Sequence, residues 1–354
     1  MGAVVRVAFV LGTTSGGTGR HVLMLTEGLV RRGHQVVVIG PQSVEDAFGF
    51  TKAGARFVAV AVSDRPHPVN DLRAVLAVRR LTREADVVHA HGLRAGALAA
   101  LAGRGPRLVV TLHNALTAGG MVGAVYAALE RIVARRADRV LVVSPDLGER
   151  MRALGARDVS AAVVPAPDLR PAVRTPAEVR AELGAGDRPI LLSLARLAQQ
   201  KGLEVLLDVA AGLDAVLFVI AGDGPLRGEL KGRIDAEGLP VVLLGNRGDV
   251  PDLLGAATAV VWPSRWEGQP LSLSETLKAG RPVIATAVGG IPELVGEAGV
   301  LVPFGDVAAM RSAVQEIISD PERAESLARA SARRGAELPT ADDAVVAALY
   351  AYGS

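Results

Sequence analysis

Residues 4–40 read VVRVAFVLGTTSGGTGRHVLMLTEGLVRRGHQVVVIG, and this stretch decides the fold class. Its apolar run at 4–11 ends in a Gly-rich turn, and apolar residues at helical spacing then lead to a second apolar run at 35–40. Short β-branched runs separated by a helical segment are typical of parallel strands joined by a right-handed crossover. The stretch therefore predicts a strand, a helix and a second strand parallel to the first.

The same alternation extends along most of the chain, with one interruption. A chain of 354 residues is long enough for two domains by the usual relation between length and domain count. We therefore expect an α/β protein with two doubly wound parallel sheets. Further apolar runs, most of them followed by a helical pattern, lie at 55–62, 86–91, 107–114, 189–196, 215–222, 241–245, 259–264 and 282–286.

The interruption, at 163–189, contains five prolines and a predicted short helix that Thr175 caps before Pro176. We expect it to connect the two domains. The last helix of the chain is expected to pack back toward the N-terminal domain. The N-terminal domain, the linker, the C-terminal domain and the last helix are placed at 1–170, 171–188, 189–335 and 336–354.

The composition excludes several kinds of site. The chain has no cysteine, so disulfides, cysteine nucleophiles and thiolate metal sites are all excluded. It has no run of about 18 apolar residues, and its first ten residues lack the order of a secretory signal. We expect a cytoplasmic protein without a nucleic-acid partner.

The net charge of +2 hides a difference between the two halves. Residues 1–185 carry 24 Lys and Arg against 15 Asp and Glu, a net charge of +9, whereas residues 186–354 carry a net charge of −7. A basic half favours an anionic partner, such as a phosphate-bearing acceptor or a membrane surface. The alternative is a set of ordinary solvated arginines.

The first strand–helix turn is rich in glycine, as in loops whose backbone N–H groups approach a phosphate. It does not match the dinucleotide-binding fingerprint, because Gly17 and Gly19 are followed by Val22 where a third small residue belongs. It does not match a P-loop either, since Thr18 stands where the lysine belongs. A loop that approaches phosphate or substrate and a plain tight turn both remain open.

Three histidines end neighbouring predicted strands. His89 and His91 share one face of a strand, and His113 ends the next strand along the chain. Ligands gather at the carboxyl ends of such strands, so we expect an active-site role for at least one of the three. A metal site is the weaker alternative, because no carboxylate clusters with them. One of the pair His89 and His91 is the candidate for a buried, hydrogen-bonded structural role.

Two cations bracket a strand–helix turn in the second half. Arg196 ends a predicted strand and Lys201 precedes a helix, a spacing that suits the two phosphates of a diphosphate. Two more Gly-rich turns, at 221–230 and 243–250, end predicted strands of the same sheet. Each is compatible with a simple turn, but together they would line one sheet edge.

Residues 266–280, WEGQPLSLSETLKAG, follow another predicted strand. We expect Ser272 or Ser274 to cap a helix whose first turn contains Glu275, and the helix dipole alone would explain that carboxylate. Glu267 falls in the preceding loop and has no such explanation. An ionised carboxylate there can accept hydrogen bonds from sugar hydroxyls, each worth roughly 1.5–3 kcal/mol.

The ordered set of these motifs resembles the retaining glycosyltransferases of the GT-B fold, in particular glycosyltransferase family 4. The resemblance covers nearly the whole chain and implies two Rossmann-like domains facing each other across a cleft. The matching pieces are SGGTG, DVVHAH, TLHN, VSPDLGERM, the spacing from Arg196 to Lys201-Gly202, AGDGPLRGEL, LLGN, WPSRWEG, the seven residues between Glu267 and Glu275, and GGIPELV.

The resemblance also implies roles for single residues. The C-terminal domain is expected to bind a nucleoside diphosphate (NDP) sugar and the N-terminal domain an acceptor. By resemblance Arg196 and Lys201 hold the diphosphate, Glu267 the donor sugar and Glu275 the ribose, while His91 lies beside the sugar. Further expected donor contacts are Gly16, Gly17, Gly222, Asn246, Arg247, Gly268, Gln269, Pro270 and Leu271, and the acceptor-side candidates are His89, His113 and Asn114.

Two departures from the family pattern stand out. Where relatives often have Glu-Gly-Phe-Gly-Leu, this chain has Pro270 in place of the second glycine, which removes one backbone N–H. Where many members have Pro-Asn-Gly-Val-Asp between the domains, this chain has Pro-Ala-Pro-Asp-Leu at 165–169. The first departure bears on donor binding and the second on the interdomain segment.

We therefore predict transfer of a hexose-type sugar from a UDP- or GDP-linked donor, with retention at the anomeric carbon and departure of the diphosphate from the same face. No metal and no cofactor are expected, because Arg196, Lys201 and helix N-termini supply positive charge. The alternatives are an NDP-sugar epimerase or phosphorylase on the same fold, and a nucleotide-sugar-binding protein without catalysis. The acceptor stays open, an anionic or lipid-linked molecule being one option, with peripheral membrane contact through the basic half.

Overall fold

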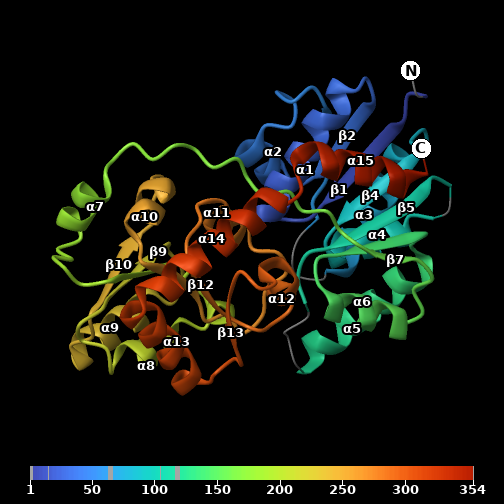
Figure 1. Cartoon of the computed structure of the whole chain (residues 1–354). Helices are drawn as coiled ribbons and strands as arrows, with labels where there is room; N and C mark the ends of the chain where they lie inside the picture. The colour runs from blue at the N-terminus through green and yellow to red at the C-terminus, as the bar shows by residue number, and fades with distance from the viewer. Residues whose placement is uncertain (1–2, 15, 63–66, 104, 116–119, 354) are drawn as a thin grey trace. The chain divides into compact units, whose positions relative to one another are not determined.

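The structure is a computed structural model that describes residues 3–14, 16–62, 67–103, 105–115 and 120–353, the side chains of 120–122 excepted. The chain divides into two compact units, which Figure 1 shows as two sheets with helices packed around each. Unit 1 runs up to Pro165 and includes the segment from Pro339 onward, and unit 2 is Ala166–Leu338.

The described part of unit 1 contains a seven-stranded sheet in the order β3-β2-β1-β4-β5-β6-β7, with every pairing parallel. In the register Val7 lies opposite Val36 on one side and Val87 on the other. Such inner strands have helices on both faces, which explains why their sequences are continuously apolar. The strands are β1 (Arg6–Leu11), β2 (Gln35–Gly40), β3 (Arg56–Ala59), β4 (Val87–His91), β5 (Arg107–Leu112), β6 (Arg139–Val142) and β7 (Val159–Ala161).

Helices follow the strands of unit 1 along the chain. The last helix of this unit comes after unit 2 in the sequence. Gly28 lets this last helix approach the first, because a Cβ on Gly28 would lie 2.3 Å from a Val345 methyl carbon. The described helices are α1 (Gly17–Arg31), α2 (Gln42–Phe48), α3 (Pro68–Leu81), α4 (Leu93–Leu101), α5 (Gly120–Arg136), α6 (Pro145–Ala153) and α15 (Ala341–Tyr352).

Unit 2 repeats the architecture with a six-stranded sheet in the order β10-β9-β8-β11-β12-β13, again parallel throughout its described strands. Its strands are β8 (Ile190–Leu194), β9 (Leu217–Ala221), β10 (Val241–Gly245), β11 (Ala259–Trp262), β12 (Val283–Thr286) and β13 (Gly299–Val302). Its helices are α7 (Pro176–Glu182), a short 3-10 helix η1 (Gln199–Lys201), α8 (Leu203–Ala210), α9 (Arg227–Glu237), α10 (Val250–Ala256), α11 (Leu271–Lys278), α12 (Ile291–Val295), α13 (Val307–Ser319) and α14 (Pro321–Glu337).

The segment expected as a linker contains the predicted short helix. Thr175 caps α7 and forms a reciprocal capping box with Glu178, which confirms the cap predicted there. By its contacts the segment from Ala166 onward belongs to unit 2, and α7 packs on α10. Arg174 adds hydrogen bonds to the buried Asp252.

Two parallel, doubly wound sheets confirm the fold class predicted from the sequence. Each central strand is followed by a helix that returns the chain to the sheet's starting edge. The carboxyl ends of the strands in each unit therefore gather at one edge, where the candidate residues lie. Of the described helices, none combines the length and the apolarity that a bilayer-spanning helix requires.

Candidate active site

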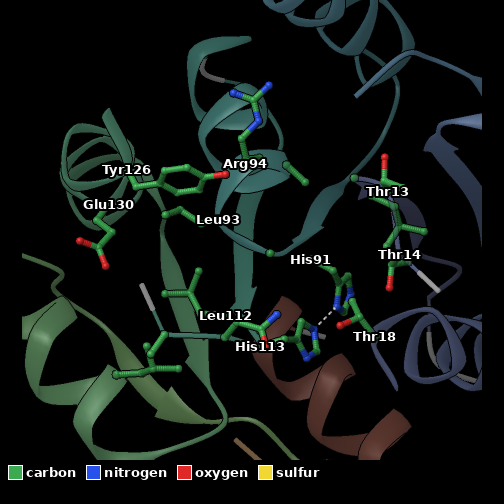
Figure 2. Close-up of a pocket in the computed structure, with 17 residues that line it drawn as sticks. Thr13, Thr14, Thr18, His91, Leu93, Arg94, Leu112, His113, Tyr126 and Glu130 are labelled. Atoms are coloured by element: carbon green, nitrogen blue, oxygen red, sulfur yellow. Dashed lines mark hydrogen bonds between the residues drawn. The ribbon is translucent and has the colours of Figure 1, made fainter. Parts of the chain in front are cut away.

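A pocket of about 410 Å³, lined by both polar and apolar side chains, opens at the carboxyl ends of β1, β4 and β5 in unit 1. Figure 2 shows threonines of the segment between β1 and α1 on one side and Tyr126 of α5 on the other. Its described lining residues are Leu11, Gly12, Thr13, Thr14, Thr18, His91, Gly92, Leu93, Arg94, Ala95, Leu112, His113, Asn114, Ala115, Tyr126, Glu130 and Leu147.

His91 and His113 meet in this pocket, as the prediction of shared strand ends required. Nδ1 of His91 lies 3.0 Å from Nε2 of His113, a contact that Figure 2 marks. Burial lowers the pKa of His91 well below its usual range, and lowers that of His113 to about 3. Both rings are therefore neutral at pH 7, so one of them donates its N–H to the unprotonated nitrogen of the other.

His21 joins this cluster, although no motif in the sequence marks it as a site residue. It lies on the buried face of α1, and its ring meets the rings of His91 and His113 edge-on at 5.7 Å between centroids. Burial lowers the pKa of His21 to about 4. Its only sequence signal is helical spacing with buried Val22 and Leu25, which by itself predicts a core position.

His89 has the structural role that was left open for one of the strand histidines. Its side chain is buried, and its ring nitrogens lie 2.7 Å from the Tyr352 hydroxyl and 2.7 Å from the Thr111 hydroxyl. His89 does not line this pocket. We therefore withdraw it as an acceptor-side candidate, whereas His113 and the exposed Asn114 keep that position.

Both charged side chains among the described lining residues form ion pairs. Arg94 donates to Asp71 at 2.7 Å, and the buried Glu130 accepts from Arg150 at 2.5 Å. Neither pair was predicted, because 23 and 20 positions separate the partners and no short motif joins them. The pocket thus combines neutral imidazoles and hydroxyls with charges that are already paired.

In unit 2 the predicted Lys201 and Glu267 are in direct contact. Nζ of Lys201 lies 2.5 Å from Oε1 of Glu267, and the hydroxyl of Ser264 donates to the same oxygen at 2.7 Å. Glu267 is 4% exposed. The sequence pattern predicts both charges at the carboxyl edge of this sheet but not their pairing.

Two glycines allow the loops at this edge to pack closely. Gly202 has a φ of +59°, and a Cβ on it would lie 2.1 Å from the carbonyl oxygen of Pro263. Gly289 has a φ of +55°, and a Cβ there would lie 1.9 Å from the carbonyl oxygen of Glu267. No other residue fits either position, because both the backbone angle and the space exclude a side chain.

The cap predicted for α11 is wrong in detail. The helix begins at Leu271 with Pro270 as its N-cap, no side chain caps it, and Glu275 lies in its second turn. The Pro270 carbonyl accepts from the N–H groups of Leu273 and Ser274. Because an N-cap carbonyl is sufficient for this role, proline fits here despite its missing N–H. The first-turn N–H groups of α11 thus stand directly after Glu267-Gly268-Gln269.

Other predicted donor residues of unit 2 lie in the turns after β8, β9 and β10, and they differ in exposure and in their contacts. Arg196 is exposed in the turn after β8, and the N–H of Gly222 donates to the Gly245 carbonyl at 2.8 Å. Asn246 is exposed, whereas Arg247 is held by ion pairs to Glu182 and Asp249. In unit 1, Gly16 caps α1 and Gly17 begins it.

Known proteins match both units. A model of the glycosyl transferase 4-like domain matches residues 16–167, and a model of glycosyl transferases group 1 matches residues 176–334. D-rhamnosyltransferase WbpZ of Pseudomonas aeruginosa is 30% identical over 278 residues, which cover 74% of this chain and 72% of the relative. The chain belongs to the group 1 glycosyltransferases.

Alpha-D-kanosaminyltransferase of Streptomyces kanamyceticus is 36% identical to this glycosyltransferase family member over 182 residues, 49% of this chain and 46% of the relative. The chain spans about half the length of the first curated relatives it matches. The structure of Anabaena Alr3699/HepE in complex with UDP and glucose superposes with a TM-score of 0.82 at 19% identity, over 99% of this chain and 100% of that one. The fold is that of the GT-B glycosyltransferases.

Proposed function

We propose that this chain transfers a hexose-type sugar from an NDP-sugar to an acceptor with retention of the anomeric configuration. The observation that supports this most is the Lys201–Glu267 pair at the carboxyl edge of the unit 2 sheet, with Ser264 on the same carboxylate oxygen. A cation for phosphate and a carboxylate for sugar hydroxyls then lie within one hydrogen bond of each other.

In this proposal the donor binds in unit 2. Arg196 and Lys201 hold the diphosphate, and their positive charge stabilises the charge that develops as the diphosphate leaves. The first-turn N–H groups of α11 add a helix N-terminus to the same site. Glu267 binds hydroxyls of the transferred sugar, and Glu275 binds the ribose.

The acceptor binds in the pocket at the ends of β1, β4 and β5, where His91 and His113 offer neutral ring nitrogens and the threonines offer hydroxyls. The reaction proceeds without a metal, because cationic side chains and helix N-termini take over the charge stabilisation. Turnover that continues in EDTA supports this point, and turnover that stops in EDTA and returns with Mg²⁺ overturns it.

The test of the proposal is incubation with UDP-glucose, GDP-mannose and related donors in the absence of acceptor. We expect slow release of the NDP together with the free sugar, and faster release once an acceptor is found. The Anabaena neighbour was solved with UDP and glucose, which makes UDP-glucose the first donor to try. Interconversion of one NDP-sugar into another indicates an epimerase instead, phosphate-dependent cleavage indicates a phosphorylase, and binding without any turnover indicates a non-catalytic protein.

We further propose peripheral contact of unit 1 with an anionic membrane at its cytoplasmic face. Val69, Leu72 and Leu76 expose their side chains along α3, at a spacing that puts them near one face of the helix. Unit 1 carries 21 Lys and Arg against 14 Asp and Glu, and its net charge of +7 favours anionic lipid. Co-sedimentation with anionic liposomes at low salt, lost at high salt, is the expected result; absence of pelleting at low salt refutes the contact.

A further inference from the structure

The two oxygens of the Glu267 carboxylate differ in their surroundings. Oε1 accepts two hydrogen bonds, from Lys201 at 2.5 Å and from Ser264 at 2.7 Å. Within the described parts of the chain, no group is hydrogen-bonded to Oε2. One oxygen is thus bound by the protein, and the other receives no hydrogen bond from the described residues.

Ser264 is itself firmly held. Its side chain is 1% exposed, and its carbonyl accepts a hydrogen bond from the buried Thr286 hydroxyl at 2.6 Å. The backbone of Glu267 is held separately, because its carbonyl accepts from the N–H of Gly290 at 3.0 Å. The Ser264 hydroxyl is therefore a donor whose position does not depend on Lys201.

Lys201 is the more adaptable of the two donors. Its side chain is 22% exposed, and an ammonium on a four-carbon stem can turn between partners. The proposed function asks Lys201 to bind a diphosphate, whereas in the structure it binds Glu267. If Lys201 turns toward phosphate, Ser264 is the described side chain that still holds the carboxylate.

We propose that Ser264 is a positioning residue, which fixes the Glu267 carboxylate through Oε1 so that Oε2 meets a hydroxyl of the donor sugar while Lys201 binds the diphosphate. The identity of the two ligand groups rests on the proposed function. The geometry that Ser264 imposes on Glu267 does not, and it can be tested without any ligand.

The first experiment compares the binding of UDP-glucose with UDP, and of GDP-mannose with GDP, by calorimetry. In the Ser264→Ala variant we expect the affinity for the preferred NDP-sugar to fall roughly tenfold, because a hydrogen bond to an ionised group is lost, while the affinity for the NDP stays unchanged. Ser193→Ala is the matched control, since it also removes a buried hydroxyl, which donates to the Val261 carbonyl at 2.6 Å. Equal losses for NDP and NDP-sugar overturn the proposal.

The second experiment is the crystal structure of the ligand-free Lys201→Met variant. We expect Oε1 of Glu267 to stay within hydrogen-bond distance of the Ser264 hydroxyl. A carboxylate that swings away from Ser264 overturns the positioning role, whatever ligand the protein takes. Failure of the wild-type protein to bind any NDP contradicts the proposed function instead, so the two outcomes are distinguishable.

Discussion

Replacement of Lys201 by methionine tests the Lys201–Glu267 pair most directly, because it removes the charge and keeps a similar apolar stem. The carboxylate would remain with the Ser264 hydroxyl as its described partner, and its side chain is only 5% exposed. Breaking a fully buried ion pair costs about 3–5 kcal/mol. Since Lys201 is 22% exposed and its pairing is partly screened, we expect a loss of roughly 2–3 kcal/mol in the free energy of unfolding of unit 2.

Glu267→Gln should be milder. The amide keeps the volume and an acceptor for Ser264, and the ammonium that loses its partner can reach water, so we expect a loss of about 1–2 kcal/mol. The double variant Lys201→Met/Glu267→Gln carries neither charge. It should therefore be more stable than the sum of the two single losses predicts, by at least about 1 kcal/mol.

Tryptophan fluorescence during urea unfolding reads out unit 2 alone. The chain has two tryptophans, and both Trp262 and Trp266 lie in unit 2. The control is Gly238→Ala at the C-cap of α9, where an added Cβ would meet no atom within 4 Å. It shows how much stability unit 2 loses when a residue outside the pair is replaced. The 2.5 Å contact implies that the two substitutions are coupled. If the double variant loses as much stability as the two single variants together, to within about 0.5 kcal/mol, that coupling is refuted.

Three further outcomes follow from the geometry. In urea unfolding, Gly202→Ala should destabilise unit 2 by at least about 2 kcal/mol more than Gly238→Ala. Both glycines have nearly the same φ and ψ, but of the two only Gly202 would place a Cβ against a backbone oxygen. Equal losses would contradict the close approach of Gly202 to Pro263. Tyr352→Phe should cost roughly 1–2 kcal/mol in urea unfolding followed by far-UV circular dichroism, because it leaves a buried ring nitrogen of His89 unpaired. By the same measurement Tyr350→Phe, at a 74% exposed residue, should cost almost nothing. In the folded chain the pKa of His21 is lowered to about 4 and that of His113 to about 3. The stability that these two neutral rings contribute is therefore complete above pH 6.5 and falls with pH, by about 2 kcal/mol for each at pH 5. Constant stability of unit 1 between pH 7 and pH 5 would contradict this prediction.

The sequence predicts the fold well because its central strands are continuously apolar. β1, β4, β8 and β9 lie within the predicted apolar runs, since burial on both faces leaves a clear pattern. The short strands β6 and β7 were not predicted, because they have only four and three residues and lie at one side of the sheet. Capping chemistry identified the start of α7 but not that of α11, where Pro270 acts through its backbone alone.

The candidate site could be predicted only in part. Strand ends gather at one sheet edge, so the pattern correctly brought His91 near His113 and Lys201 near Glu267. Which atoms touch depends on side-chain packing between distant residues, and 66 positions separate Lys201 from Glu267. His89 and His91 lie two residues apart on one face of the strand, so the sequence pattern does not tell them apart. The contacts of His89 with Thr111 and with Tyr352, which lies 263 positions away, show that His89 is the structural one.

We propose that the chain moves a sugar from an NDP-sugar with retention, using Lys201 and Glu267. The most direct measurement is ¹H NMR of the anomeric signals during turnover of the preferred donor, for the wild type and for Glu267→Ala. We predict that the first-formed product of the wild type has the donor's anomeric configuration, and that Glu267→Ala loses most of the turnover. A product of inverted configuration, or full activity in Glu267→Ala, would contradict the account.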